Sequence, residues 1–446
     1  MNTNDDAAQK DTSVRAVEHK TNWVHPGVLP AFVLIVTCFA AWGISTDLTA
    51  PMVKIFSTVF DMSAFQSALV QFAYYGAYFL LAIPAAMINS RLGYKGGVSI
   101  GMGLAAIGAF LFFPAAKVMT FPTFLAALFI LAGGLSIVET SANPFVMALG
   151  PEENATRRLN FAQAFNPIGS NIGVLMATLL VAPHIAPVPK DAVKGSPELL
   201  AKTANELSHV IVPYIALGIF YAALAIAIFA VKIPRNKELE ETDHVGSVRQ
   251  GVFGRLWHNG TYRFGVIAQF FNIAAQTCIW TYIPFYVSGP QSVLHMSTSA
   301  GTWWLQISLI FFLVMRFLMV WLMGRFDGRK LMVFMCGLGI VLTMVGIVSG
   351  TVFGALCMAA LSGCISLLFP TIYGISLTGL GADTKYGSSG LVMAIIGGAI
   401  APLVQGRLID AAGVQVSFTF VVLCFAVVLS FGLYALKHQI GMNDQA

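Results

Sequence analysis

Three ionisable residues stand inside long apolar stretches of this sequence: Asp47, Glu139 and Arg316. A charge near the centre of a lipid bilayer costs at least about 2.5–3.5 kcal/mol, so such residues usually face a cavity, a partner or an ion path. Burial disfavours the ionised form of a carboxylate, which allows it to exchange protons near neutral pH when water reaches it. We therefore predict that Asp47 and Glu139 couple proton movement to another process.

Two of these residues have a second interpretation. Asp47 lies close to Pro51 and Lys54 and could instead cap or kink a helix near a membrane surface. Arg316 could bind a substrate or act as a structural charge between helices, because a guanidinium does not release its proton under these conditions.

Neutral amides and aromatic residues lie in the same apolar stretches. Gln269, Asn272 and Gln276 are spaced by three and four residues, so they share one face of a helix. Neutral donors and acceptors suit a ligand rich in hydroxyl groups, although each amide could instead form hydrogen bonds between helices. The predicted substrate-binding residues are Glu139, Asn143, Gln163, Asn166, Gln269, Asn272, Gln276, Trp280 and Tyr373.

The composition places these residues in a membrane. Hydrophobic residues make up 57% of the 446 positions, charged residues only 10%, and the mean hydropathy is +0.77. A bilayer core needs roughly 20 apolar residues per helix, so the length accommodates about twelve spans. The apolar runs lie near 28–56, 64–89, 96–116, 120–149, 159–183, 209–231, 264–288, 300–324, 331–350, 352–379, 388–408 and 415–436.

The basic residues predict the orientation of those spans. If both termini are cytoplasmic, eighteen Lys and Arg residues lie on that side and six on the other, with Arg316 inside a span. The excess of basic residues in cytoplasmic loops predicts both ends of the chain in the cytoplasm. We expect cytoplasmic tails at 1–27 and 437–446 and a multi-pass protein of the bacterial inner membrane.

The twelve spans divide into two similar halves. The predicted division is a six-helix bundle at 28–231, a cytoplasmic linker at 232–263 and a second six-helix bundle at 264–436. Arg91 and Arg325 stand in corresponding loops about 234 residues apart, and Pro144 and Pro370 in corresponding spans. Repeated halves are typical of carriers that move one half against the other around a central site. Arg91 and Arg325 are candidates for structural or gating charges.

Several other classes of function find no support in the sequence. We find no nucleophile elbow, zinc-protease or phosphate-loop motif, so an enzyme is not expected. The six cysteines have no paired spacing, and we predict neither a metal nor a cofactor. The net charge of +5 is explained by membrane topology, so no nucleic-acid partner is expected, and we expect a monomer in the bilayer.

Specific motifs resemble those of the L-fucose:proton symporter family of the major facilitator superfamily. They are Glu139-Thr140-Ser141-Ala142-Asn143-Pro144, the run from Arg158 to Asn166, Arg316-Phe317, Pro370-Thr371-Ile372 and Asp383-Thr384-Lys385-Tyr386-Gly387-Ser388-Ser389. The resemblance implies an all-α fold of twelve transmembrane helices in two six-helix bundles. It also implies that Glu139 takes part in sugar binding and proton coupling and that Gln163 lines the cavity.

The sequence departs from that family at three positions. Ala50 stands where the family has its first-helix acid, and Asp47 lies about 4.5 Å away along a helix. Phe369 replaces a tyrosine of the fucose carrier, and Trp303 replaces an asparagine of its cavity. The predicted substrate is therefore a hexose, a deoxyhexose or an N-acetylhexosamine, carried with protons. A sugar uniporter and a proton-driven exporter of small molecules are the alternatives.

Overall fold

The computed structural model describes residues 23–59, 64–176, 179–180, 197–232, 251–288 and 292–438. The predicted terminal tails and the linker fall mostly outside these residues. The helices are α1 (Leu29–Val59), α2 (Ala64–Val118), α3 (Phe121–Ala148), η1 (Glu152–Asn154), α4 (Ala155–Gln163), α5 (Asn166–Met176), α6 (Pro197–Ala230), α8 (Val252–His258), α9 (Gly260–Val287), α10 (Thr298–Leu322), α11 (Gly328–Val348), α12 (Val352–Ile365), α13 (Leu368–Leu377), η4 (Gly381–Asp383), α14 (Thr384–Met393), η5 (Ala394–Ile396), α15 (Gly397–Ala412), α16 (Val414–Ser417) and α17 (Thr419–Lys437).

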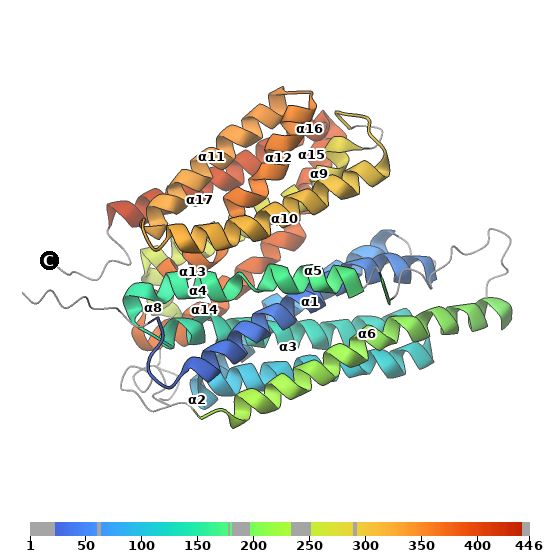
Figure 1. Cartoon of the computed structure of the whole chain (residues 1–446), viewed down its shortest axis with the longest axis horizontal. Coiled ribbons are helices and arrows are strands. Elements are labelled where there is room, and N and C mark those ends of the chain that lie inside the picture. The colour runs from blue at the N-terminus through green and yellow to red at the C-terminus, as the bar shows by residue number, and fades with distance from the viewer. Residues whose placement is uncertain are drawn as a thin grey trace, which may run out of the picture.

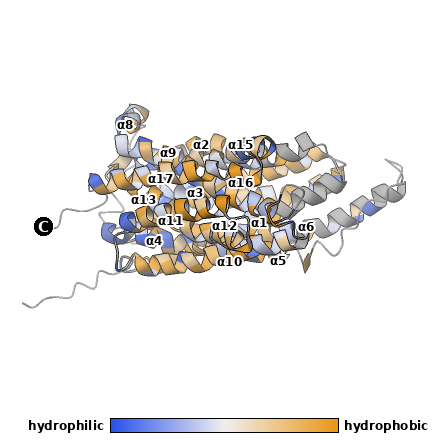
Figure 2. Ribbon diagram, turned by 90° about the horizontal axis from the view of Figure 1, so that it is seen from above, coloured by the Kyte–Doolittle hydropathy of each residue, from blue (hydrophilic) through white to orange (hydrophobic). Residues whose placement is uncertain are grey.

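The helices confirm the predicted membrane architecture. Within the described residues, ten helical stretches are long and apolar enough to cross a bilayer. One of them, Phe72–Val118, has 47 residues and contains two spans, because Gly93 breaks α2 with a φ of 69°. The predicted span at 159–183 corresponds to α4 and α5, which are separated at Ala164 and Phe165. Figure 2 shows hydrophobic residues along the helices and hydrophilic residues gathered near α4 and α8.

Local sequence explains where several spans begin. The Asn259 side chain accepts a hydrogen bond from Tyr262 N at the start of α9, and Asp327 accepts one from Arg329 N at the start of α11. Such side chains satisfy donors that the first helical turn leaves unpaired. The linker predicted at 232–263 contains α8, and α9 begins four residues before the predicted second bundle.

The helices form two groups that lie side by side (Figure 1). Helices α1 to α6 make up one group and α9 to α17 the other, and both described ends of the chain, Trp23 and His438, lie at the end near α8. We call this the terminus-bearing end. There the groups share one buried cluster, because Phe369 and Tyr373 of α13 and Tyr386 of α14 pack with residues of the first group.

Glycines allow very close helix packing inside the first group. A Cβ atom at Gly169 of α5 would stand 1.8 Å from the Ala40 carbonyl oxygen of α1, and one at Gly43 would stand 2.0 Å from Asn166 O. Small residues at such crossings bring helix backbones together, which is a main source of helix association in lipid. Helices α1 and α5 therefore hold the residues on their cavity side in fixed positions.

Gly169→Leu should separate α1 from α5 and lower the stability of the protein by at least about 1–3 kcal/mol, the usual cost of overpacking. The measurement is thermal unfolding in detergent together with the yield of monodisperse protein. Gly103→Ala is the control, because a Cβ at Gly103 meets nothing within 4 Å. Equal melting temperatures for the two variants would contradict the close α1–α5 contact.

Candidate functional site: a polar cavity between the two halves

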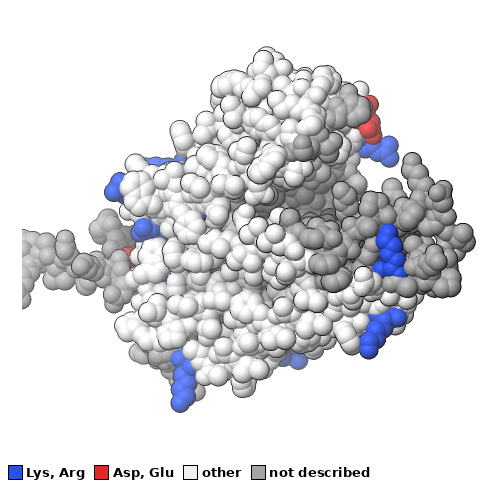
Figure 3. Space-filling model, turned by 45° about the vertical axis from the view of Figure 1, so that its right-hand side comes forward, with Lys and Arg blue, Asp and Glu red and all other residues white. Residues whose placement is uncertain are grey.

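A cavity of about 360 Å³ lies between the two groups of helices. This volume is within the roughly 300–1,000 Å³ range of small-molecule sites. Figure 3 shows a hollow in the middle of the molecule, with the charged side chains of this face toward its edges. The lining residues are Trp42, Thr46, Val70, Tyr74, Tyr75, Tyr78, Glu139, Gln163, Asn166, Pro167, Ser170, Asn171, Val174, Ile273, Gln276, Thr277, Trp280, Thr281, Gln306, Leu309, Phe312, Arg316, Phe369 and Ile395.

Glu139 is the acidic residue that faces this cavity among the described side chains. It comes from α3, and only 1% of its surface is exposed. Neither carboxylate oxygen has a hydrogen-bond partner among the described residues. A buried charge without a partner is very costly, so this environment favours the uncharged carboxylic acid. Glu139 can therefore bind and release a proton in step with access of water to the cavity.

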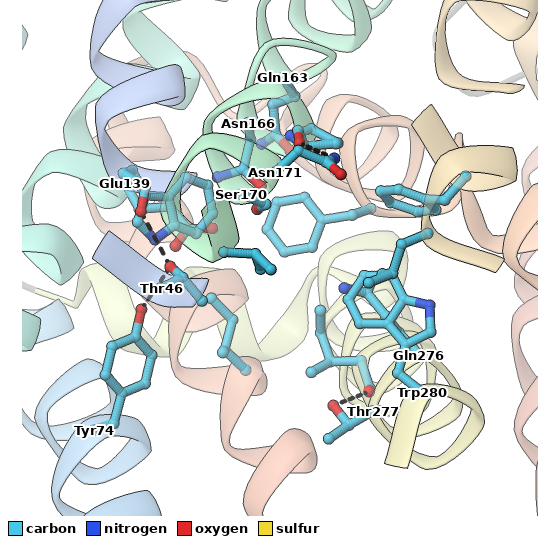
Figure 4. Close-up of a pocket in the computed structure, with 18 of the residues that line it drawn as sticks. Thr46, Tyr74, Glu139, Gln163, Asn166, Ser170, Asn171, Gln276, Thr277 and Trp280 are labelled. Atoms are coloured by element: carbon cyan, nitrogen blue, oxygen red, sulfur yellow. Dashed lines mark hydrogen bonds between the residues drawn. The ribbon is translucent and has the colours of Figure 1, made fainter. Parts of the chain in front are cut away.

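Tyrosines from α2 form the wall next to Glu139 (Figure 4). The hydroxyl groups of Thr46 and Tyr74 are 2.9 Å apart, and those of Tyr74 and Tyr78 are 3.5 Å apart. The rings of Tyr74 and Tyr75 meet edge to face at 5.6 Å. This wall offers both hydroxyl groups and apolar ring surface to a ligand.

The amide side chains of α4 and α5 are fixed by hydrogen bonds. Gln163 Nε2 donates to Asn143 Oδ1 over 2.7 Å, and Asn166 Nδ2 donates to Phe39 O over 3.3 Å. Arg316 of α10 donates from Nη1 to the Gln163 carbonyl oxygen over 2.9 Å, which joins the two halves. Arg316 therefore holds Gln163 in place, and its Nε has no partner among the described residues.

An aromatic wall forms the opposite side of the cavity. The Arg316 guanidinium lies 4.8 Å from the Phe312 ring centroid, and Phe312 meets Trp280 edge to face at 5.2 Å. Trp280 Nε1 donates to Ser362 Oγ over 2.9 Å, which fixes the orientation of the indole ring. Apolar ring faces of this kind can pack against the CH groups of a sugar.

Two amides bridge the cavity away from the terminus-bearing end. Gln306 Nε2 of α10 donates to Asn171 Oδ1 of α5 over 3.3 Å. Sequence reasoning missed both residues, although Asn171 follows Asn166 by five residues in the same amide-rich stretch. Thr46 and Thr277 were also missed, because a threonine hydroxyl in a helix often bonds to a carbonyl of its own helix, as both do here.

The terminus-bearing end is closed by contacts between the halves. Arg157 Nε donates to Val320 O over 3.0 Å, and its guanidinium lies 4.9 Å from the Trp23 ring centroid. Asn160 Nδ2 donates to Thr371 Oγ1 over 3.3 Å. The cavity is thus sealed from this side in the conformation described here.

The structure brings six of the predicted substrate-binding and charged residues together around the cavity. They are Glu139, Gln163, Asn166, Gln276, Trp280 and Arg316. Four others are buried beside the cavity without lining it: Asn143, Gln269, Asn272 and Tyr373. Asp47 lies in α1, and its side chain falls outside the described residues.

The two predicted loop charges occupy different surroundings. Arg91 is exposed, and the exposed Arg325 guanidinium lies 3.9 Å from the Trp321 ring centroid. The ion pair of the second loop is formed instead by Arg329 and Asp327. Burial acts to raise the pKa of Asp327, but the hydrogen bonds and charge of Arg329 outweigh this effect and lower it.

Only one of the two cavity substitutions predicted from the sequence lies in the cavity. Phe369 lines it, whereas Trp303 is 68% exposed and is absent from the lining. The prediction that Trp303 alters the binding surface is therefore not supported by its position. A tryptophan on the outer face of α10 is in a position typical of side chains that contact lipid or lie at the membrane interface.

The family is established by comparison with known proteins. The sequence profile described as Major Facilitator Superfamily matches residues 32–384. The chain belongs to this superfamily. It is 40% identical over 420 residues to the L-fucose-proton symporter of Haemophilus influenzae, covering 91% of this chain and 96% of the relative. It thus belongs to the L-fucose:proton symporter family, whose members are multi-pass membrane transporters rather than enzymes.

Two further similarities concern substrate and conformation. A glucose/galactose transporter of Brucella abortus is 31% identical over 403 residues, which cover 90% of this chain and 92% of that one. The crystal structure of the major facilitator transporter FucP in the outward conformation superposes with a TM-score of 0.83 at 33% identity, covering 92% of this chain and 99% of FucP. The all-α fold of two six-helix bundles is therefore confirmed.

Asn171→Ala and Gln306→Ala should each weaken substrate transport, and the double variant should be no worse than the stronger single variant. The reason is that removing either amide already breaks the one hydrogen bond between them. The measurement is initial uptake rate in cells at matched expression. If the losses of uptake rate in the two single variants add up in the double variant, the two amides act independently. That result would contradict a functional hydrogen bond between them.

Proposed function

We propose that this protein is a proton-coupled sugar symporter that takes up a hexose, a deoxyhexose or an N-acetylhexosamine by alternating access. The observation that carries the proposal is the position of Glu139, a buried carboxyl group without a hydrogen-bond partner among the described residues, in a cavity whose other lining side chains are uncharged except for Arg316. The names of the L-fucose-proton symporters and glucose/galactose transporters among the relatives support the same substrate class.

The chemistry of the cavity favours a neutral, hydroxyl-rich ring. Gln163, Asn166 and Gln276 supply donors and acceptors without charge, and Trp280 supplies a fixed ring face. A lipophilic cation would find few partners for its charge among these amides. The lining of the cavity therefore supports a sugar symporter better than an exporter of such cations.

The proposed cycle begins with the cavity facing away from the terminus-bearing end. Glu139 takes up a proton there, together with Asp47 from α1, and the sugar binds among the amides and aromatics. The halves, 28–231 and 264–436, then rock about the linker at 232–263. The contacts of Arg157 and Asn160 break, and the sugar and proton leave at the terminus-bearing end.

We further propose the orientation and setting of the protein. Both termini lie in the cytoplasm, the protein works as a monomer in the bacterial inner membrane, and Arg91 and Arg325 act as structural or gating charges in cytoplasmic loops. Substrate release at the terminus-bearing end then corresponds to uptake into the cell.

Glu139→Gln should abolish proton movement, because an amide cannot bind and release the proton. Unbuffered, de-energised cells expressing the protein receive single sugars from a panel of the three classes, and external pH is recorded. The expected result is alkalinisation with at least one sugar for the unchanged protein and for the exposed control Glu152→Gln, and none for Glu139→Gln.

Two outcomes would overturn the coupling. Equilibration of radiolabelled sugar without any alkalinisation would indicate a uniporter. Alkalinisation that persists in Glu139→Gln would show that another group carries the proton.

Phe369→Tyr should raise the preference for L-fucose relative to the other transported sugars by about fivefold, the worth of roughly one hydrogen bond. The added hydroxyl lies at a cavity-lining position that is a tyrosine in the fucose carrier. Trp303→Asn makes the other fucose-like substitution at an exposed position and should leave the preference unchanged. A changed sugar preference in Trp303→Asn but not in Phe369→Tyr would show that the cavity assignment of these two residues is wrong.

A further inference from the structure

A stripe of polar residues on α9 continues beyond the wall of the cavity. Gln276 and Trp280 line the cavity, and Asn272 and Gln269 lie one and two turns closer to the start of the helix on the same face. Because α9 begins beside α8, this direction leads toward the terminus-bearing end (Figure 1). The stripe thus extends from the cavity into the closed part of the molecule.

Asn272 and Gln269 are fully buried there without satisfying their hydrogen bonds. Both have 0% exposed surface, and the amide nitrogen and oxygen of each have no partner among the described residues. A buried donor or acceptor without a partner costs about 1–3 kcal/mol. Two complete amides in this condition weaken the closed arrangement, which indicates a role in another conformation.

Two further buried polar side chains, Asn143 of the first half and Tyr373 of the second, lie beside the cavity without lining it. Asn143 of α3 uses its oxygen to accept from Gln163, while its amide nitrogen has no partner among the described residues. The Tyr373 hydroxyl of α13 is fully buried and lies near enough to Asn143 and Glu139 to interact with both. Polar side chains of α3, α9 and α13 are therefore buried outside the lining of the cavity.

We propose that Gln269 and Asn272, with Asn143 and Tyr373, form an inner sugar-binding site that opens only when the terminus-bearing end opens. The inference rests on the proposed function, because it concerns the second half of the same transport path. The ligand is the hydroxyl-rich ring of the transported sugar, whose hydroxyls supply the partners these amides lack. Sugar leaving Gln276 passes to Asn272 and Gln269 on its way into the cytoplasm.

The site predicts that sugar recognition differs between the two sides of the membrane. Gln269→Met and Asn272→Leu replace the amides by apolar groups of similar size. The Michaelis constant for sugar exchange should rise about tenfold in inside-out vesicles, where sugar enters from the terminus-bearing side. In right-side-out vesicles, where sugar reaches the cavity first, it should change less than twofold.

Thermal unfolding of the same variants separates a binding role from a structural one. If the amides serve recognition, their apolar replacements should melt at the same or a higher temperature, because unpartnered polar atoms are removed from the closed state. Gln276→Leu, at a position that lines the cavity, is the control. It should raise the Michaelis constant for sugar exchange in both inside-out and right-side-out vesicles.

Each outcome bears on the proposal. Equal changes on both sides, no change on either side, or lower melting temperatures with lost activity would overturn the inner site. Absence of sugar exchange by the unchanged protein would instead overturn the proposed function. The two failures are therefore distinguishable.

Discussion

The burial of a single carboxyl group in a membrane protein is the constraint on which this structure depends. The carboxylate oxygens of Glu139 have no hydrogen-bond partner among the described residues, so its charged form is tolerated only where water or a ligand reaches it. A residue of this kind is expensive to keep in the middle of a helix. The unfavourable free energy of burial is offset by function in a protein whose two halves alternately expose the same residue to opposite sides of the membrane.

The contacts within and between the halves differ in a way that fits such a motion. Inside the first half, α1 and α5 are in backbone contact at Gly43 and Gly169, which leaves no space for independent movement. Between the halves, the polar contacts described are separate side-chain hydrogen bonds, from the 2.9 Å bond of Arg316 to Gln163 O to the 3.5 Å bond of Tyr386 to Ser90. Rigid units joined by weak contacts move as bodies at small cost.

The relatives and the cavity together indicate a class of substrate, neutral sugars, but not one particular sugar. Relatives named for L-fucose and relatives named for glucose and galactose both match more than nine-tenths of their own length. Phe369 gives the cavity wall an aromatic ring without a hydroxyl, while Glu139, Gln163 and Asn166 supply polar groups. Discrimination among sugars therefore depends on a few polar contacts, each worth about a factor of five to ten.

The sequence by itself determined the class of protein, the membrane spans and the acid at the centre of the site. These follow from local properties: apolar runs of membrane length, the distribution of Lys and Arg, and the exceptional cost of Glu139 in an apolar stretch.

Only the tertiary structure decided which amides line the cavity and which are buried beside it. Gln276 and Gln269 share one helix face, yet Gln276 lines the cavity whereas Gln269 is fully buried outside it. Asn171 and Gln306 meet across 135 positions of sequence, and Trp303 points away from the cavity side of α10. Helical periodicity fixes the face on which a residue lies, whereas the packing of distant helices fixes what that face meets.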